Sequence, residues 1–166
     1  MEKIEISIGI NNIKERVQRE SGTIAKARAG AGVADSLADM LPATDDESDI
    51  IEKNISAKLN GLMTLIGRYM PACRLATREN NGETGHTVTV IVPHNYPNAN
   101  GNKIKKCIEE ILFCSTMQEW ALLIKPDEAG IYTEKTNEAT VQLRTVLAER
   151  KRPAMKNGSK ENIIEL

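Results

Sequence analysis

The chain has 166 residues, a length typical of one domain, and its 40% hydrophobic and 27% charged residues exclude a wholly disordered or fibrous protein. Aromatic residues make up only 3%, so the core must be built mainly from Ile, Leu, Val, Ala and Met. The net charge of −1 argues against a generally basic nucleic-acid-binding protein but leaves local patches open. No run approaches the ~18 apolar residues of a membrane span, and no apolar signal segment opens the chain, so neither membrane insertion nor export is expected. The three cysteines are therefore expected to be free thiols.

The N-terminal residues predict a strand followed by a helix. Isoleucines at alternate positions have the period of a half-buried strand: Ile4, Ile6, Ile8 and Ile10. Asn11 and Asn12 offer an N-cap for a helix that extends to a break expected at Gly30 and Gly32. A short helix is then expected over residues 33–41.

The clearest helix start in the chain is at residue 44. Thr44 and Glu47 have the spacing of a capping box, and the acidic residues between them suit the positive end of a helix dipole. Apolar residues then recur every three or four positions: Ile51, Ile55, Leu59, Leu62 and Ile66. This pattern predicts a long helix over residues 45–70.

Residues 73–92 change from helical to strand periodicity. The β-branched run 87–92 predicts a strand, with residues 73–77 as its partner and Asn81-Gly82 as the turn between them. The connecting loop is expected to be longer than two residues, which leaves the register open. Residues 94–102, rich in asparagine, predict a loop.

Two further helices are predicted, over 103–124 with Asn102 as cap and over 126–150 with Pro126 in its first turn. The buried side of the first is assigned to Ile104, Ile108, Ile111, Met117 and Leu122. After Ile111 this helix is apolar nearly all round, so it is either central to the fold or covered by a partner subunit. The inward residues of the second are assigned as Ala129, Tyr132, Ala139, Leu143, Val146 and Leu147.

The predicted fold class is mainly α (α+β), a helical bundle with a β-hairpin insertion and a short N-terminal strand. One domain is expected over 1–153, with the hairpin at about 73–92. A flexible C-terminal tail is expected over 154–166, in which Ile163, Ile164 and Leu166 offer docking side chains.

No credible catalytic constellation is present in the sequence. Gly30-x-Gly32 lacks the third glycine and the lysine of phosphate-binding loops, and the acidic stretch 45–49 lacks the spacing of a calcium loop. Cys73, His86 and His94 match no zinc pattern. We therefore expect no enzyme activity, no cofactor and no metal.

Charge is distributed unevenly along the chain. Seven acidic and no basic residues lie between Asp35 and Glu52, whereas six basic residues and one acidic residue, Glu149, lie between Arg144 and Lys160. Such charges ordinarily match helix dipoles and keep a tail soluble. Alternatively, the two segments are complementary patches that meet on a neighbouring copy, or the basic one meets DNA phosphates.

The last two helices resemble proteins of tailed phages and prophages, namely head–tail connector (head-completion adaptor) proteins. The resemblance covers about 102–153 and also about 44–71, where Thr44-Asp45-Asp46-Glu47 opens a long helix as in the same proteins. It rests on a Trp-containing helix end, a Pro-x-Glu-Ala start, a long helix and a basic-Pro ending: Met117 to Lys125, Pro126-Asp127-Glu128-Ala129, Tyr132, Leu143-Arg144, Leu147 and Arg150-Lys151-Arg152-Pro153.

The resemblance implies a small helical bundle with a β element and a structural role without chemistry. Copies would form a homo-oligomeric ring that contacts the portal protein and tail or neck proteins and extends the DNA channel. The location implied is the virion neck, assembled in the bacterial host cytoplasm, with no membrane partner. The bundle is expected to comprise helices 45–70, 103–124 and 126–150. The interface is assigned to the 73–92 hairpin, the basic tail and six residues: Arg144, Arg150, Lys151, Arg152, Trp120 and Tyr132.

Two other functional classes remain open. A cytosolic helical DNA-binding or regulatory module would bind phosphates through the basic C-terminal segment, with an affinity that falls steeply with salt. An enzyme of unfamiliar type would use Cys73 or His94.

Overall fold

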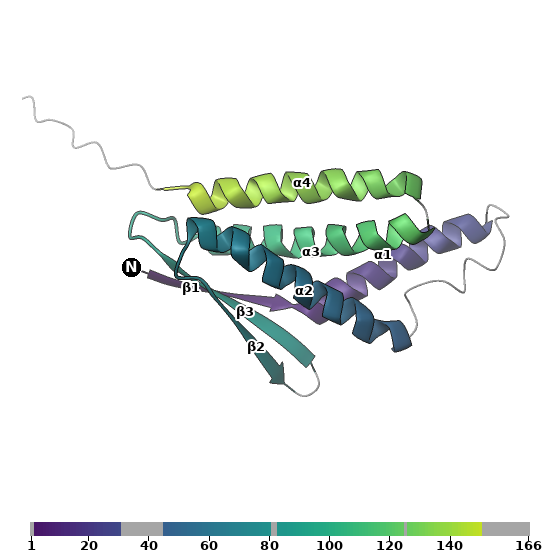
Figure 1. Cartoon of the computed structure of the whole chain (residues 1–166), viewed down its shortest axis with the longest axis horizontal. Helices are drawn as coiled ribbons and strands as arrows, with labels where there is room; N and C mark the ends of the chain where they lie inside the picture. The colour runs from purple at the N-terminus through teal and green to yellow at the C-terminus, as the bar shows by residue number, and fades with distance from the viewer. Residues whose placement is uncertain (1, 31–44, 81–82, 125, 151–166) are drawn as a thin grey trace, which may run out of the picture.

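A computed structural model describes the backbone of residues 2–30, 45–80, 83–124 and 126–150, and the side chains of residues 2–24, 50–77, 85–123 and 126–150. Four helices and a three-stranded antiparallel sheet make up this part of the chain, which confirms the mainly α, α+β class (Figure 1). The elements follow in the order β1 (Glu2–Gly9), α1 (Ile10–Gly30), α2 (Asp45–Tyr69), β2 (Arg74–Asn80), β3 (Glu83–Val92), α3 (Asn100–Ile124) and α4 (Pro126–Ala148).

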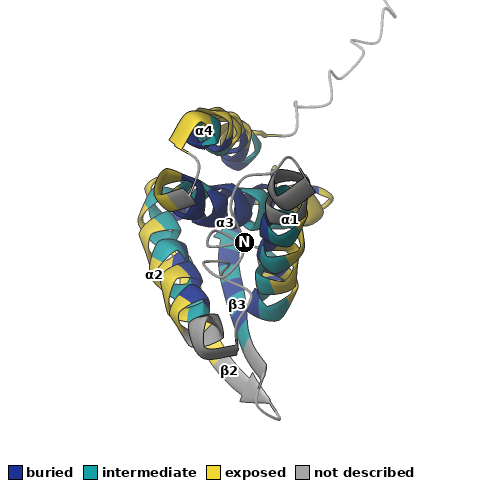
Figure 2. Ribbon diagram, turned by 90° about the vertical axis from the view of Figure 1, so that its right-hand side faces the viewer, coloured by how far each residue is buried: buried dark blue, intermediate teal, exposed yellow. Residues whose placement is uncertain are grey.

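Helix α3 is the centre of the molecule. Seen end-on, α4 lies over one side of it, α1 and α2 flank it, and the sheet lies beneath (Figure 2). Its buried residues occupy nearly the whole circumference: Ile104, Cys107, Ile108, Ile111, Leu112, Phe113, Cys114, Thr116, Met117, Trp120 and Ala121. The sequence left two explanations for the apolar circumference, a central place in the fold or cover by a partner subunit. Burial within the fold accounts for nearly the whole length of α3.

The N-terminal strand and the predicted hairpin form one sheet, in which β3 lies between β1 and β2. Alternate residues of β1 and β3 face the helices and are buried, as the period-two pattern predicts: Ile6, Ile8, Val88, Val90 and Val92. Residues 81 and 82 alone separate the paired Asn80 and Glu83, so the expectation of a longer loop was wrong. Strand β2 also extends three residues beyond the predicted Thr77.

Two helix starts differ from the sequence prediction. Helix α1 begins at Ile10 directly after β1, because Ile10, Ile13 and Val17 share one buried helical face, so Asn11 and Asn12 lie inside the helix. Helix α3 begins at Asn100 rather than after Asn102.

Leu122 was wrongly assigned to the core, since its side chain is 54% exposed. The inward positions of the last turns of α3 belong to Met117, Trp120 and Ala121, which follow one another at helical spacing. Helices α2 and α4 confirm the remaining pattern, apart from the half-buried Leu62 and Val146. The predicted helix over 33–41, the Thr44 cap and the tail over 154–166 lie outside the described residues.

Three helical glycines provide a test of the packing between α3 and β1. A Cβ added at Gly61 or Gly130 meets no atom within 4 Å, whereas one added at Gly101 lies 3.0 Å from Ile4 Cγ2. We expect Gly61→Ala and Gly130→Ala each to raise the free energy of unfolding by about 0.5–1 kcal/mol, because alanine loses less backbone entropy in a helix. Gly101→Ala should gain less, or lose, because Ile4 must move. Urea unfolding measures all three, and an equal gain at Gly101 would contradict the contact between α3 and β1.

Candidate interaction surfaces

The structure separates the predicted interface residues. Arg144 on α4 and Arg150 just after it are exposed, whereas Trp120 and Tyr132 are buried, with exposed fractions of 8% and 5%. Residues 151 and 152 lie outside the described part of the chain. The two aromatic side chains therefore pack within this molecule, and the two arginines are the described part of the predicted basic surface.

Tyr132 ties α4 to α1. Its hydroxyl donates a hydrogen bond to Glu20 Oε1 at 3.1 Å, and burial, together with the Glu20 carboxylate, raises the pKa of Tyr132 to about 12. The indole Nε1 of Trp120 is buried and has no hydrogen-bond partner among the described residues. Both rings contribute mainly apolar area to the packing around α3.

The C-terminal end of α4 is held by a buried aromatic residue from the segment 94–102, which was predicted only to be a loop. Tyr96 is fully buried, and its hydroxyl donates to the Val146 carbonyl at 2.9 Å. Asn100, also buried, donates from Nδ2 to Glu149 Oε2 at 2.9 Å. In a chain with so few aromatic residues, a tyrosine within a loop was the signal that this loop packs against the fold.

Arg150 completes this attachment. Its Nη1 donates to the carbonyls of Leu147 at 2.9 Å and Glu149 at 2.7 Å, and its guanidinium lies 5.6 Å from the centre of the Tyr96 ring. A cation on the last carbonyls of a helix is favoured by the helix dipole. The contacts of Tyr96, Asn100 and Arg150, which we call the α4 lock, fix the position of Arg150, the last residue that the structure describes.

A groove runs between α3 and α4 on the side of Cys107. It consists of two adjoining hollows of about 330 and 340 Å³ that share Lys106, Cys107 and Gln142. One reaches Arg16 and Glu110. The other is lined further by Lys103, Val141, Thr145 and Val146. From here on, the name "α3–α4 groove" refers only to this second hollow, in which Lys103 and Lys106 lie beside exposed aliphatic surface.

Two ion pairs tie α3 to its flanking helices. Arg16 of α1 donates to both carboxylate oxygens of Glu110, at 2.6 and 3.2 Å, and Lys58 of α2 lies 2.9 Å from Glu119 Oε2. Burial alone would raise the pKa of Glu110, but hydrogen bonds from Arg16 and Cys114 and the charge of Arg16 outweigh it and lower that pKa. The paired charges orient α1 and α2 on opposite flanks of α3.

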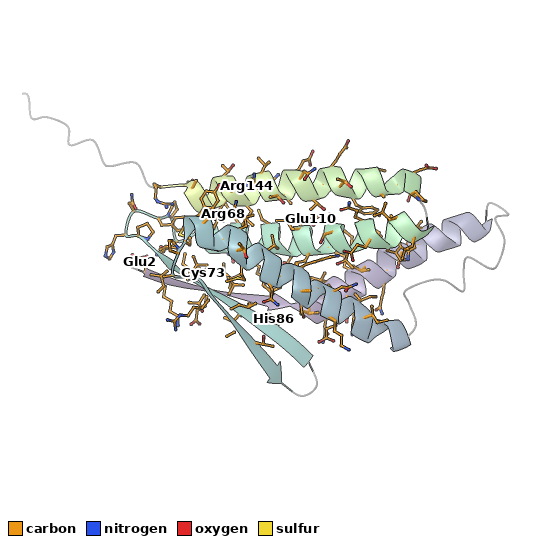
Figure 3. The ribbon with its side chains drawn as sticks, in the orientation of Figure 1. Glu2, Arg68, Cys73, His86, Glu110 and Arg144 are labelled. Atoms are coloured by element: carbon orange, nitrogen blue, oxygen red, sulfur yellow. The ribbon has the colours of Figure 1, made fainter. Side chains whose placement is uncertain are left out.

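The described parts of the two charged segments lie toward opposite ends of the molecule. Helix α2 begins at the end of the molecule where α3 ends and α4 begins, and its first two turns contain the acidic residues. Helix α4 ends at the opposite end of the molecule (Figure 1). Arg68, in the last turn of α2, and Arg144 lie toward this second end (Figure 3). We call the first two turns of α2 the acidic end, and the region of Arg68, Arg144 and Arg150 the basic end.

Cys73 and His86, two of the residues considered for chemistry, lie apart in the structure. Thr77 pairs with His86 in the sheet, so Cys73, four residues earlier, lies about 13 Å away along the strand. Burial raises the pKa of all three cysteines, that of Cys114 to about 12, which keeps the thiols protonated and weakly nucleophilic at neutral pH. No group of three metal-ligating side chains occurs among the described residues.

His86 is the one buried histidine of the described chain, and both its ring nitrogens have hydroxyl partners. Ser56 Oγ lies 3.3 Å from Nε2, and Thr77 Oγ1 lies 3.1 Å from Nδ1. A hydrolytic Ser–His pair has a group, usually a carboxylate, that orients the second nitrogen, and here that place is taken by a neutral threonine. The cluster links α2, β2 and β3, which fits a structural histidine.

Comparison of the chain with models of known protein families, with curated proteins and with solved structures finds no match. In the part of the chain that the structure describes, no helix is long and apolar enough to cross a membrane.

His86 makes stability depend on pH. Burial lowers its pKa below the usual 6.5, against the opposing effect of Glu52, so the unfolded state binds more protons as the pH falls below 6.5. The stabilisation that neutral His86 provides above pH 6.5 is therefore lost as the pH falls through the lower, folded-state pKa. We expect His86→Gln to flatten this acid-side decrease in the free energy of unfolding, measured by urea titration at a series of pH values. A His86→Gln variant that keeps the wild-type slope would contradict the assignment.

Proposed function

We propose that this protein is a structural, non-enzymatic adaptor that assembles head to tail into a ring at the joint between the portal and the tail of a tailed phage. The observation that carries the proposal is the position of the acidic and basic ends at opposite ends of one compact fold. The location at the portal–tail joint is proposed from the resemblance of the last two helices to head–tail connector proteins.

The distance between the two ends matters because salt screens charges. Helix α2 has 25 residues, and 19 to 23 of them separate residues 45–49 from Arg68, so the acidic end lies about 30 Å along the helix axis from the turn that holds Arg68. This exceeds the Debye length of about 8 Å at physiological ionic strength. The two ends of one described fold therefore attract each other weakly, whereas contact between two copies brings the opposite charges together.

Helix dipoles account for part of the charge at each end. Acidic residues in the first turn of α2 suit its positive end, and Arg68 and Arg150 suit the negative ends of α2 and α4. The effect is confined to the terminal turns of a helix, and the acidic and basic segments of the sequence extend beyond them. A contact between unlike surfaces of identical chains repeats, and it closes into a ring when the rotation between copies permits.

Charge reversal tests the assembly. We expect replacement of Asp45, Asp46 and Glu47 by lysine, or of Arg144, Lys151 and Arg152 by glutamate, to shift the protein from oligomer to monomer in mass photometry. Combining the two sets should restore the oligomer, because attraction returns with the signs exchanged. Arg150 is kept because it belongs to the α4 lock. Failure of the combined variant to reassemble, or a wild-type protein that stays monomeric alone and with purified portal rings in electron micrographs, would reject the proposal.

The DNA-binding alternative gives a different pattern in the same variants. Arg150 is engaged with carbonyls of its own helix end and with the Tyr96 ring, so of the two described arginines of the basic C-terminal segment we expect Arg144 to contact phosphate. Lysines added at the acidic end would then strengthen binding to duplex DNA at low salt, measured by fluorescence anisotropy. They would not restore the oligomer.

A further inference from the structure

The α3–α4 groove combines apolar and positively charged surface. Val141 is 59% exposed on α4, with the half-buried Val146 one turn and a half further on. Lys103 and Lys106 of α3 line the same hollow of about 340 Å³. Such a surface suits a short peptide that carries aliphatic side chains and carboxylates, because burial of the former and pairing of the latter act together.

One segment of this chain has that composition and is outside the described residues. Residues 161–166 read Glu-Asn-Ile-Ile-Glu-Leu, with three aliphatic side chains and two carboxylates in six residues. Residues 150–160, which precede it, contain five basic and no acidic residues. The acidic, aliphatic segment is thus distinct from the rest of the tail and complementary to the groove.

The last described residues lie beside the groove. Lys103 Nζ, on the groove, lies 3.9 Å from Glu149 Oε2, directly after the end of α4. Val141 lies seven residues before Ala148, about 10 Å back along the helix. Residues 151–162 can span about 40 Å when extended, so the segment can reach the whole groove. Asn157-Gly158, a dipeptide that favours chain reversal, lies between the lock and the segment.

We propose that residues 161–166 of this chain fold back into the α3–α4 groove, with the isoleucines against its valines and the glutamates beside its lysines. The tether makes the docking intramolecular. A short flexible linker gives an effective concentration of about 1 mM, which exceeds the micromolar concentrations at which copies meet in solution. The proposal does not depend on the phage setting or on ring formation.

Cys107 provides a readout in the native sequence. Its thiol lines the groove, whereas Cys73 precedes β2 and is half-buried at another site, so it serves as an internal reference. We expect Ile163→Asp/Ile164→Asp to increase the rate of alkylation of Cys107 relative to Cys73, measured by mass spectrometry of the full chain. At an effective concentration of about 1 mM and a dissociation constant of about 0.1 mM, release from the groove raises the rate about tenfold.

The matched control places the same charges elsewhere in the tail. Ala154→Asp/Met155→Asp should leave the ratio of Cys107 to Cys73 alkylation at the wild-type value, and circular dichroism melting curves verify that both variants remain folded. An unchanged ratio in the Ile163→Asp/Ile164→Asp variant overturns the proposal. So does wild-type protection that grows on going from about 5 µM to about 500 µM protein, because the segment would then dock on a neighbouring copy.

Discussion

The burial of helix α3 on almost every side is the constraint from which the rest of the fold follows. The consecutive residues Leu112, Phe113 and Cys114 are all buried, so no face of the helix at that level can be left to water. One covering element is insufficient for such a helix. Helix α4 covers it on one side, α1 and α2 cover its flanks, and the sheet covers the side that remains (Figure 2).

The charged contacts at the flanks of α3 specify orientation more than they add stability. Arg16 and Glu110 keep roughly 46% and 37% of their side chains exposed, and Lys58–Glu119 is also partly exposed, so each pair is worth about 0–1 kcal/mol at most. Arg16 further lies 3.7 Å from the centre of the Phe113 ring, which couples the pair to the core. Burial lowers the pKa of Lys58 despite its carboxylate partner Glu119, because the ammonium group loses part of its hydration where α2 packs against α3.

Local patterns in the sequence predicted the elements whose signals are local. Helices α2 and α4 follow from apolar residues at helical spacing, and β1 follows from alternating isoleucines, although Ile10 belongs to the helix that comes next. The pairing of β1 with β3 joins residues far apart in sequence, and no local pattern specifies it. The same holds for Tyr96 and Asn100, whose partners lie some fifty residues away on α4.

The candidate surfaces could be predicted only in part, because their positions also depend on contacts between residues far apart in the sequence. The acidic and basic segments can be read from the sequence, but the placement of their described parts at opposite ends depends on the antiparallel packing of α3 with α4 and on the direction of α2. Trp120 and Tyr132 were assigned to an interface because they are large and lie where the resemblance is strongest. Four of the five aromatic residues are instead buried in the core, and Tyr69 is half-buried against it, since each ring buries more area than an aliphatic side chain.

The α4 lock and the α3–α4 groove together decide what the basic segment can do. The lock fixes one end of residues 151–160 at Arg150, and docking of residues 161–166 would fix the other end within about 10 Å of α4's last turn. The lysines and arginines between them would then be held as a loop at the basic end. A loop tethered at both ends loses less conformational entropy on meeting an acidic partner than a tail tethered at one, so docking would strengthen the proposed contact between copies.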